Sequence, residues 1–242
     1  MNLAIDIGNT LSKAAVIDGG QVIDIYKTET LTPAYLERVL KNNRAIDRGI
    51  LISTRGEEGE IIDMLKQRLK QLILFDHETP IPIKNDYGTP QTLGRDRLAA
   101  AVGAAALRPG EPILIVDFGT AITIDFIDER GVFKGGNISP GAQLRFQALN
   151  RYTRKLPLRQ LAEKTEFLAT SSHSAIESGV VNGIVYEIEG YIRELSQTIE
   201  KFHIIFTGGD GNFFAKRLNY PIFASQDLVL YGLNKILEYN AQ

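Results

Sequence analysis

The sequence contains no cysteine, and this absence removes several chemistries at once. Disulfide bonds, thiolate metal centres and cysteine nucleophiles are all excluded. The three histidines, His77, His173 and His203, are scattered without a metal-ligand spacing, so we interpret them as structural or surface residues. The string Gly-x-x-x-x-Gly-Lys-Ser/Thr is also absent, so any phosphate-binding turn in this chain is not a Walker loop.

The chain also lacks an excess of either charge and any long apolar run. Its 27 basic and 29 acidic residues give a net charge of -2, which predicts neither a nucleic-acid partner nor an anionic membrane partner. No apolar run approaches membrane-spanning length, and no basic segment followed by an apolar core opens the chain. With 44% hydrophobic and 23% charged residues, the composition is that of a globular protein, which we expect to be cytoplasmic.

Two similar segments carry the functional prediction. Residues 3–10 read LAIDIGNT and residues 114–121 read LIVDFGTA, and their aspartates, Asp6 and Asp117, are separated by close to half of the chain. In each copy an apolar run predicts a buried strand, and the glycine opens a turn whose N–H groups can approach an anion. A carboxylate beside such a turn suits a metal-bound polyphosphate. Ordinary turn chemistry is the alternative, but two copies in equivalent contexts favour a site.

The order of expected elements supports a duplication. In the first half we expect strands at 2–7, 12–18, 21–26 and 49–53 and helices at 33–43, 59–71 and 97–107. In the second half we expect strands at 112–118, 121–128, 132–134, 203–207 and 222–224 and helices at 142–151, 174–202, 212–218 and 227–239. The breaker cluster Arg108-Pro109-Gly110 marks a boundary. We therefore predict an α/β protein of two duplicated domains, 1–109 and 110–242, each opening βββα, with a cleft between them.

Polar residues follow the first of these aspartates. Gly8, Asn9, Thr10 and Lys13 supply backbone, amide and hydroxyl donors and one positive charge for phosphate oxygens. Taken alone, Lys13 is better explained as a solvent-facing strand residue. In the context of the Asp-x-Gly turn, the group predicts a phosphate-binding site.

A second candidate site lies in the segment from Tyr87 to Arg97. Asp96 stands at the expected start of a helix between Arg95 and Arg97, whose charges favour the ionised carboxylate. An arginine could also bind a carboxylate in a bidentate manner. A capping role for Asp96 is the alternative, and from these residues alone the two readings have equal weight.

Two glycine-rich segments complete the pattern. Residues 135–141 read GGNISPG before a helix, where a loop could line a ligand, close against a subunit or only turn a corner. Thr207-Gly208-Gly209-Asp210 follows a strand, the place where open α/β sheets bind nucleotides. A turn that needs glycine flexibility explains the second segment equally well.

Together, the motifs DIGNT, GRDR, DFGTA, GGNISPG and TGG, in this order, resemble those of the type III pantothenate kinases. That family belongs to the superfamily of actin, the heat-shock ATPases and the sugar kinases. The resemblance implies ATP-dependent phosphorylation of pantothenate to 4'-phosphopantothenate, the first step of coenzyme A biosynthesis, with Mg²⁺ and a monovalent cation, K⁺ or NH₄⁺. A kinase of another small hydroxylated metabolite and an inactive ATP-binding homologue are the alternatives.

The resemblance also implies residue roles. Asp96 would be the general base, and Asp117 and Asp6 would be metal ligands. The ATP-binding residues would be Asp6, Gly8, Asn9, Thr10, Lys13, Gly119, Thr120, Gly208 and Gly209. The pantothenate-binding residues would be Tyr87, Gly94, Arg95, Asp96, Arg97 and Ser172. Where the family usually has Asn-Thr, this chain has Ser171-Ser172, which keeps a hydroxyl but drops a methyl group.

The resemblance further implies a homodimer that completes the pantothenate pocket. In the expected helix 174–202, apolar residues recur at four-residue intervals, at Ile176, Val180, Ile184, Ile188 and Ile192. Such a stripe must be buried, either in the core of the chain or against a second subunit. We expect the second, because Ser172 stands at the beginning of the same helix.

Overall fold

The computed structural model describes residues 1–56 and 58–241, and they divide into two compact units. The first unit comprises Met1–Glu111, Phe126–Gly135 and Asp227–Gln242, and the second comprises Pro112–Asp125 and Gly136–Gln226. Two segments beyond residue 110 therefore return to the first unit. The division of the duplicated halves into 1–109 and 110–242 stays a prediction.

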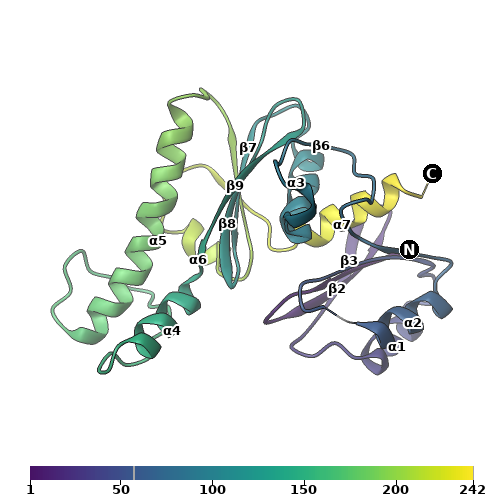
Figure 1. The fold of residues 1–242 in the computed structure, drawn as a ribbon, viewed down its shortest axis with the longest axis horizontal. Helices are drawn as coiled ribbons and strands as arrows, with labels where there is room; N and C mark the ends of the chain where they lie inside the picture. Colours follow the sequence, from purple (N-terminus) through teal and green to yellow (C-terminus); the bar gives the residue numbers. More distant parts are fainter. Residues whose placement is uncertain (57, 242) are drawn as a thin grey trace. The chain divides into compact units, whose positions relative to one another are not determined.

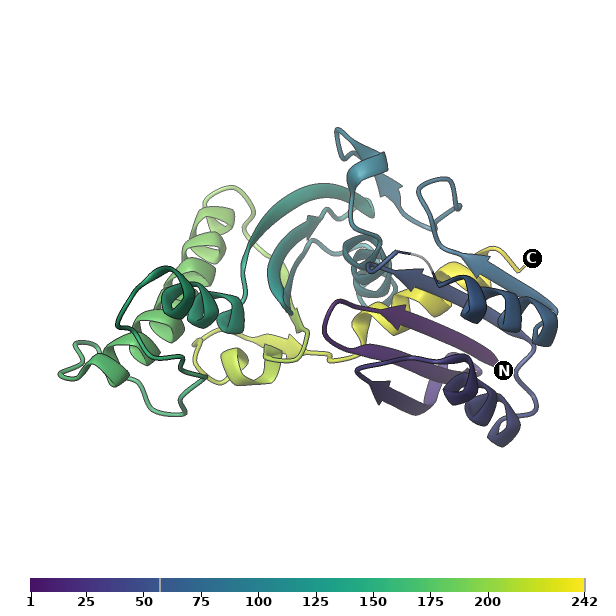
Figure 2. The same cartoon turned by 60° about the horizontal axis from the view of Figure 1, so that its bottom comes forward.

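The first unit contains a five-stranded sheet in the order β3-β2-β1-β4-β5. Its strands are β1 (Asn2–Ile7), β2 (Ser12–Asp18), β3 (Gln21–Thr28), β4 (Arg48–Ser53) and β5 (Gln71–Leu74). The first three are antiparallel, whereas β4 and β5 continue the sheet in parallel. The helices α1 (Pro33–Asn42) and α2 (Gly59–Arg68) lie together on one face of this sheet, as Figure 2 shows. The predicted order βββαβα is thus confirmed.

The side chains of β1 alternate between the two faces of the sheet. Leu3, Ile5 and Ile7 join the buried cluster formed with α1 and α2. Asn2 lies on the opposite face, where its amide donates to the Oδ1 atom of Asn234 in α7 (Leu228–Tyr239) at 2.7 Å. Because strand side chains alternate, Asp6 shares the face of Asn2. The same two-residue period that builds the core therefore directs Asp6 away from α1 and α2.

Helix α7 packs closely against α3 (Arg95–Leu107) in the first unit (Figure 1). Glycines permit this approach, because a Cβ atom at Gly103 would lie 2.6 Å from the carbonyl oxygen of Leu228. A Cβ atom at Gly232 would overlap the carbonyl oxygen of Ala99. This packing explains why the last helix of the chain belongs to the first unit.

A second sheet has the order β11-β10-β7-β8-β9-β6. Its strands are β6 (Lys84–Asn85), β7 (Ile113–Phe118), β8 (Ala121–Ile127), β9 (Val132–Pro140), β10 (His203–Thr207) and β11 (Ile222–Ala224). The second unit adds the helices α4 (Ala142–Tyr152), α5 (Ser172–Ser196) and α6 (Gly211–Ala215). Strand β10 is parallel to both β7 and β11.

The apolar stripe of α5 is buried inside the second unit. Ile184 and Ile188 are fully buried, and they belong to the same cluster as Val116 and Phe118 of β7. The five stripe residues therefore belong to the core, and our expectation that they face a second subunit was wrong. The apolar stripe of a helix in a globular protein typically faces the core, and here the core is built on the second sheet.

Three expected boundaries also differ from the structure. The glycine-rich residues 135–140 extend β9 rather than forming a loop, because Gly136, which lacks a Cβ, packs directly on the backbone of Ile124 and Asp125. Helix α2 ends at Arg68, which frees β5 to pair with β4. Helix α5 ends at Ser196 rather than at residue 202.

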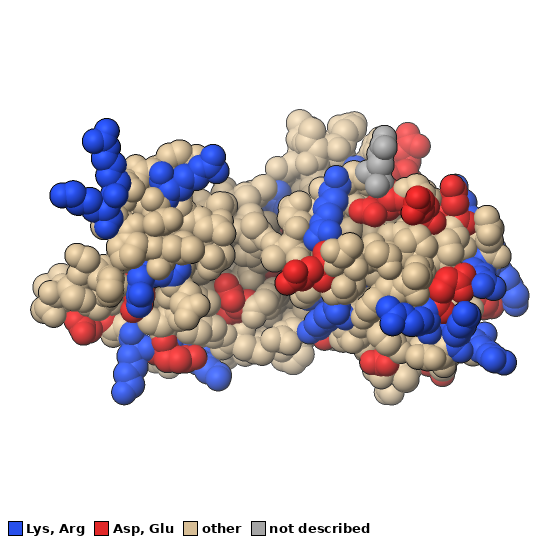
Figure 3. Space-filling view, turned by 90° about the horizontal axis from the view of Figure 1, so that it is seen from below, with Lys and Arg blue, Asp and Glu red and all other residues tan. Residues whose placement is uncertain are grey.

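Charged side chains of both signs are interspersed on the face that Figure 3 shows, as the small net charge suggests. In the described part of the chain, none of the helices combines the length and the hydrophobicity that a bilayer-crossing segment requires.

Candidate functional site

Asp6 lies near the end of β1, opposite Lys13 on the neighbouring strand β2. Burial, together with the negative charge of Asp96, raises the pKa of the Asp6 carboxyl from 3.8 to about 6, and the positive charge of Lys13 opposes this shift. The sequence motifs around Asp6 and Asp96 are far apart along the chain. The structure nonetheless brings these two carboxyl groups within electrostatic range of each other, in the first unit.

The turn after β1 is held in place from the adjacent strand. The carbonyl oxygen of Ile7 accepts from the Thr54 N–H at 2.9 Å and from the Thr54 hydroxyl at 3.2 Å. The Arg55 guanidinium donates to the carbonyl oxygen of Asn9 at 3.0 Å. A Cβ atom at Gly8 would lie 2.9 Å from the Leu11 carbonyl oxygen, which explains the glycine. Arg55 was not among the predicted site residues, because its contact with Asn9 joins segments 46 residues apart in the chain.

Asp96 occupies the first turn of α3 but is not its N-cap, which is Gly94. Its Oδ1 atom accepts from the Arg97 N–H at 2.8 Å. A side chain at Gly94 would collide with the same oxygen, so the glycine before Asp96 has a steric reason. A carboxylate in the first turn of a helix is stabilised by the helix dipole. The structure therefore places the carboxyl group of Asp96 at the start of α3, near Asp6.

The neighbours of Asp96 in the same unit include two arginines and an aromatic pair. The Arg97 guanidinium carbon lies 5.6 Å from the centroid of the Tyr87 ring, and this ring lies 6.1 Å from that of Phe133. The Arg95 guanidinium donates to the carbonyl oxygen of Leu93. Contact with the ring fixes the position of the Arg97 guanidinium, which suits recognition of a ligand carboxylate.

The second unit gathers a separate group around Asp117. Asp117 on β7 is the register partner of Thr207 on β10. Gly208 follows with φ +83°, and a Cβ atom there would overlap the Asp117 carboxylate and lie 2.6 Å from the Phe118 carbonyl oxygen. By contrast, Gly209 has open space around it. The Asp-x-Gly and Thr-Gly-Gly motifs are therefore adjacent in this unit.

The turn of Gly119 and Thr120 is packed against the start of α4. The Gly141 N–H donates to the Thr120 carbonyl oxygen at 3.0 Å, and a Cβ atom at Gly141 would lie 2.6 Å from that oxygen. The end of β9 and the second Asp-x-Gly turn therefore pack without an intervening side chain. This contact gives the last glycine of the GGNISPG motif a structural explanation.

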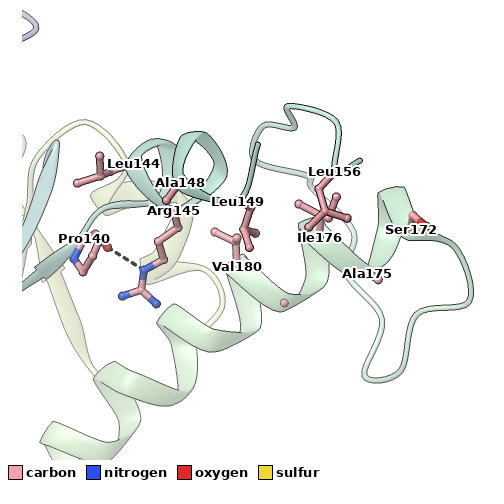
Figure 4. Close-up of a pocket in the computed structure, with 11 residues that line it drawn as sticks. Pro140, Leu144, Arg145, Ala148, Leu149, Leu156, Ser172, Ala175, Ile176 and Val180 are labelled. Carbon is pink, nitrogen blue, oxygen red and sulfur yellow. Dashed lines mark hydrogen bonds between the residues drawn. The ribbon is translucent and has the colours of Figure 1, made fainter. Parts of the chain in front are cut away.

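Ser172 occupies the first position of α5. Ser171 is the N-cap, and its side chain and that of Ser174 form a capping box. Ser172 lines an apolar cavity of about 730 Å³ between α4 and α5, which Figure 4 shows with the side chains of both helices facing one another. The structure thus assigns the capping role to Ser171 and leaves Ser172 at a cavity.

The carboxylate of Asp6 suits a cation whose remaining ligands are phosphate oxygens of the substrate. Among the described residues there is no group of three or more His, Asp or Glu side chains that could hold a metal ion. Mg²⁺ is typically bound by one or two carboxylates together with substrate phosphates. The raised pKa of Asp6 reflects its burial and the nearby negative charge of Asp96, a cost that a divalent cation would offset.

We expect an Asp6→Asn variant to be more stable than the wild type at neutral pH without nucleotide. Because the folded-state pKa of Asp6 lies above its ordinary value, ionisation destabilises the wild type as the pH rises from about 4 to 6. The difference should be absent below pH 4 and reach at most about 3 kcal/mol at pH 7. Melting temperatures measured between pH 3.5 and 8 test this, with the exposed Asp63→Asn as control. A pH-independent difference would contradict the electrostatic explanation.

Comparison with known proteins supports the family resemblance of the sequence motifs. The family model of the type III pantothenate kinases matches residues 2–194. A protein of Phocaeicola vulgatus named type III pantothenate kinase is 42% identical over 240 residues, covering 99% of each chain. A protein of Azobacteroides pseudotrichonymphae with the same name is 40% identical over 239 residues, covering 99% of this chain and 97% of that one.

Among solved structures, a Campylobacter jejuni protein described as a Baf family transcriptional activator has a TM-score of 0.63 and 23% identity, covering 98% of each chain. A Sinorhizobium meliloti protein described as a 2-dehydro-3-deoxygalactonokinase has a TM-score of 0.60 and 13% identity, covering 100% of this chain and 99% of that one. These likenesses show the fold, that of the sugar kinases and actin-like ATPases. The sequence matches show more: the chain belongs to the type III pantothenate kinase family.

Proposed function

We propose that this chain transfers the γ-phosphoryl group of ATP to the hydroxyl group of pantothenate in the cytoplasm. The product is 4'-phosphopantothenate, the first intermediate toward coenzyme A. The observation that carries the proposal is the family match over residues 2–194, joined to the closeness of Asp96 and Asp6 in the first unit. ADP release that depends on pantothenate is the direct test.

Asp96 is assigned as the general base. The substrate hydroxyl oxygen bonds to the γ-phosphorus while the bond from that phosphorus to the β–γ bridging oxygen breaks, and the hydroxyl proton passes to the Asp96 carboxylate. A carboxylate is a weak base for an alcohol, so the proton moves late, as the new bond forms. Phosphoryl transfer depends mainly on positioning and charge neutralisation, and Asp96 also orients the attacking oxygen.

The family implies ATP and a divalent metal as reaction components. Bound Mg²⁺ neutralises negative charge on the phosphates. We assign Asp6 as its ligand in the first unit, with Lys13 as a point charge toward the phosphates. The remaining ATP contacts are assigned to Gly8, Asn9, Thr10, Gly119, Thr120, Gly208 and Gly209.

Pantothenate carries a carboxylate, and the arginines of the GRDR segment suit it. We assign Arg97, whose guanidinium is held over the Tyr87 ring, and Arg95 to pantothenate binding. Gly94 lets the backbone pass close to Asp96, and Ser172 contributes its hydroxyl. Tyr87 contacts the substrate through the ring that also positions Arg97.

Removal of K⁺ and NH₄⁺ should lower the turnover of the wild type, because we assign Asp117 to hold a monovalent cation that offsets phosphate charge. In an Asp117→Ala variant the rate should be low and should no longer respond to either cation. Initial rates in K⁺, NH₄⁺, Na⁺ and tetramethylammonium chloride at constant ionic strength measure this. A wild-type rate that is equal in all four salts would refute the assignment.

We also propose a homodimer formed over α5, at a surface that includes the cavity lined by Ser172, Ile176 and Val180. Besides the cavity lined by Ser172, a second cavity of about 420 Å³ is lined by Phe167, Leu168 and Tyr186, which are 83%, 79% and 54% exposed. Ala175 and Gly179 line both cavities, so the two hollows adjoin. Adjoining apolar hollows of this kind are typical of a protein–protein interface.

Mass measurement in solution tests this assembly. The expected result is a species of twice the 26.8 kDa of one chain, which Leu168→Glu converts to monomers of lower activity. Lys164→Glu, a charge change in the same segment, serves as control and should stay dimeric. A wild-type monomer that keeps full activity on dilution would contradict both the dimer and the completion of the pantothenate pocket by a second subunit.

A further inference from the structure

Arg145, in the first turn of α4, contacts two other segments of the second unit, the end of β9 and helix α5. Its Nε atom donates to the carbonyl oxygen of Pro140 at 2.7 Å, a bond that Figure 4 shows, and its Nη2 atom lies 3.3 Å from the Ser139 hydroxyl. The same Nη2 atom pairs with Glu187 of α5. Both side chains of this pair are about four-fifths buried, with exposed fractions of 21% and 22%. A planar guanidinium is suited to several simultaneous bonds of this kind.

The segment that Arg145 contacts is followed by Gly141, which packs against the second Asp-x-Gly turn. Gly141 follows Pro140, donates to the Thr120 carbonyl oxygen and leaves no room for a side chain. A shift of Pro140 would therefore move the backbone that packs on Gly119 and Thr120. Neither the family motifs nor the sequence periodicity pointed to Arg145.

A second arginine allows a direct comparison. Arg159 pairs with Glu177 on the same helix α5 through its Nε and Nη2 atoms, and its exposed fraction of 34% exceeds that of Arg145. In the described part of the chain, the Arg159 guanidinium donates to Glu177 and not to Ser139 or Pro140. The two ion pairs thus share chemistry and partner helix but differ in the contact with the end of β9.

We propose that Arg145 is a positioning residue for the kinase reaction: it fixes Pro140 and Gly141, and through them the Gly119–Thr120 turn, relative to α5. The proposal rests on the assignment of that turn to ATP. Arg145 touches no reacting atom. Its effect is expected in the KM for ATP, because a displaced turn weakens nucleotide binding in the ground state and in the transition state alike.

The experiment compares four variants by steady-state kinetics and thermal unfolding. Arg145→Met should raise the KM for ATP about tenfold. Arg145→Lys keeps a charge for Glu187 but cannot reproduce the fork, so its melting temperature should recover while the KM for ATP stays raised. Glu187→Gln keeps the bond to Pro140 and should change the KM for ATP less than Arg145→Met. Arg159→Met should lower stability only.

The outcomes separate this inference from the function on which it rests. Equal KM values for ATP in Arg145→Met and Arg159→Met, with equal losses of melting temperature, would show that Arg145 acts only in stability and would overturn the inference. Recovery of both melting temperature and KM in Arg145→Lys would overturn it as well. A wild-type protein without pantothenate-dependent ADP release would instead refute the proposed function.

Discussion

Replacement of Asp96 by asparagine is expected to lower kcat by about 10²–10⁴-fold while the protein stays folded. Asparagine matches aspartate in size and can still accept from the Arg97 N–H, so the start of α3 should be preserved. It cannot accept the hydroxyl proton of the substrate. Measured KM values should change little, because the amide still occupies the same place beside the residues that we assign to pantothenate.

Two further measurements make the Asp96→Asn result specific. ATP binding measured by calorimetry should remain, and Asp86→Asn, which removes an exposed carboxylate paired with Lys134 in the same unit, should keep its activity. Turnover of Asp96→Asn close to that of the wild type would mean that Asp96 serves the helix start and not the chemistry. Equal losses in Asp86→Asn would point to a general effect of charge.

The Gly208→Ala variant should lose both nucleotide affinity and stability. Gly208 has φ +83°, which an alanine adopts only with strain, and its Cβ atom would overlap the Asp117 carboxylate. Either Asp117 or the backbone of Phe118 must then move. Because Asp117 is assigned to a cation beside ATP, we expect the affinity for ATP to fall by at least about tenfold, as occurs when a positioning element shifts. Calorimetric titration with ATP and thermal unfolding measure the two losses.

The neighbouring glycine is a matched control for this prediction. A Cβ atom at Gly209 meets nothing within 4 Å, and its φ lies outside the left-handed region. Gly209→Ala should therefore leave stability nearly unchanged, and any loss of ATP affinity should be smaller than that of Gly208→Ala. Equal behaviour of the two variants would contradict the steric explanation and the role given to the Asp117 group.

Local patterns predicted the elements that carry the site. The strands that carry Asp6 and Asp117 and the helix that carries Asp96 were all predictable, because apolar alternation, tight turns and helix starts depend on adjacent residues. Their family motifs also identified the site residues as candidates. The structure adds which of these motifs are adjacent: Asp96 comes close to Asp6 in one unit, and Gly208 contacts Asp117 in the other.

Features that depend on long-range packing were not predictable from sequence. The return of α7 to the first unit depends on the glycine contacts at Gly103 and Gly232, which no local pattern reveals. The spacing of the apolar stripe on α5 does not show which surface the stripe packs against, because a core sheet and a second subunit require the same spacing. Arg145 and Arg55 act through contacts with backbone carbonyls of other segments, so their residue type alone gave no signal.

The central claim is that the residues gathered around Asp6 and Asp96 and around Asp117 serve a pantothenate kinase. The most direct measurement is the rate at which the wild type releases ADP from ATP, in the presence of Mg²⁺ and K⁺, with and without pantothenate. The mass of the phosphorylated product is measured in the same reactions. Our account predicts that ADP release requires pantothenate and matches the amount of a product heavier by one phosphoryl group. ADP release at the same rate without pantothenate, or none with it, would contradict the account.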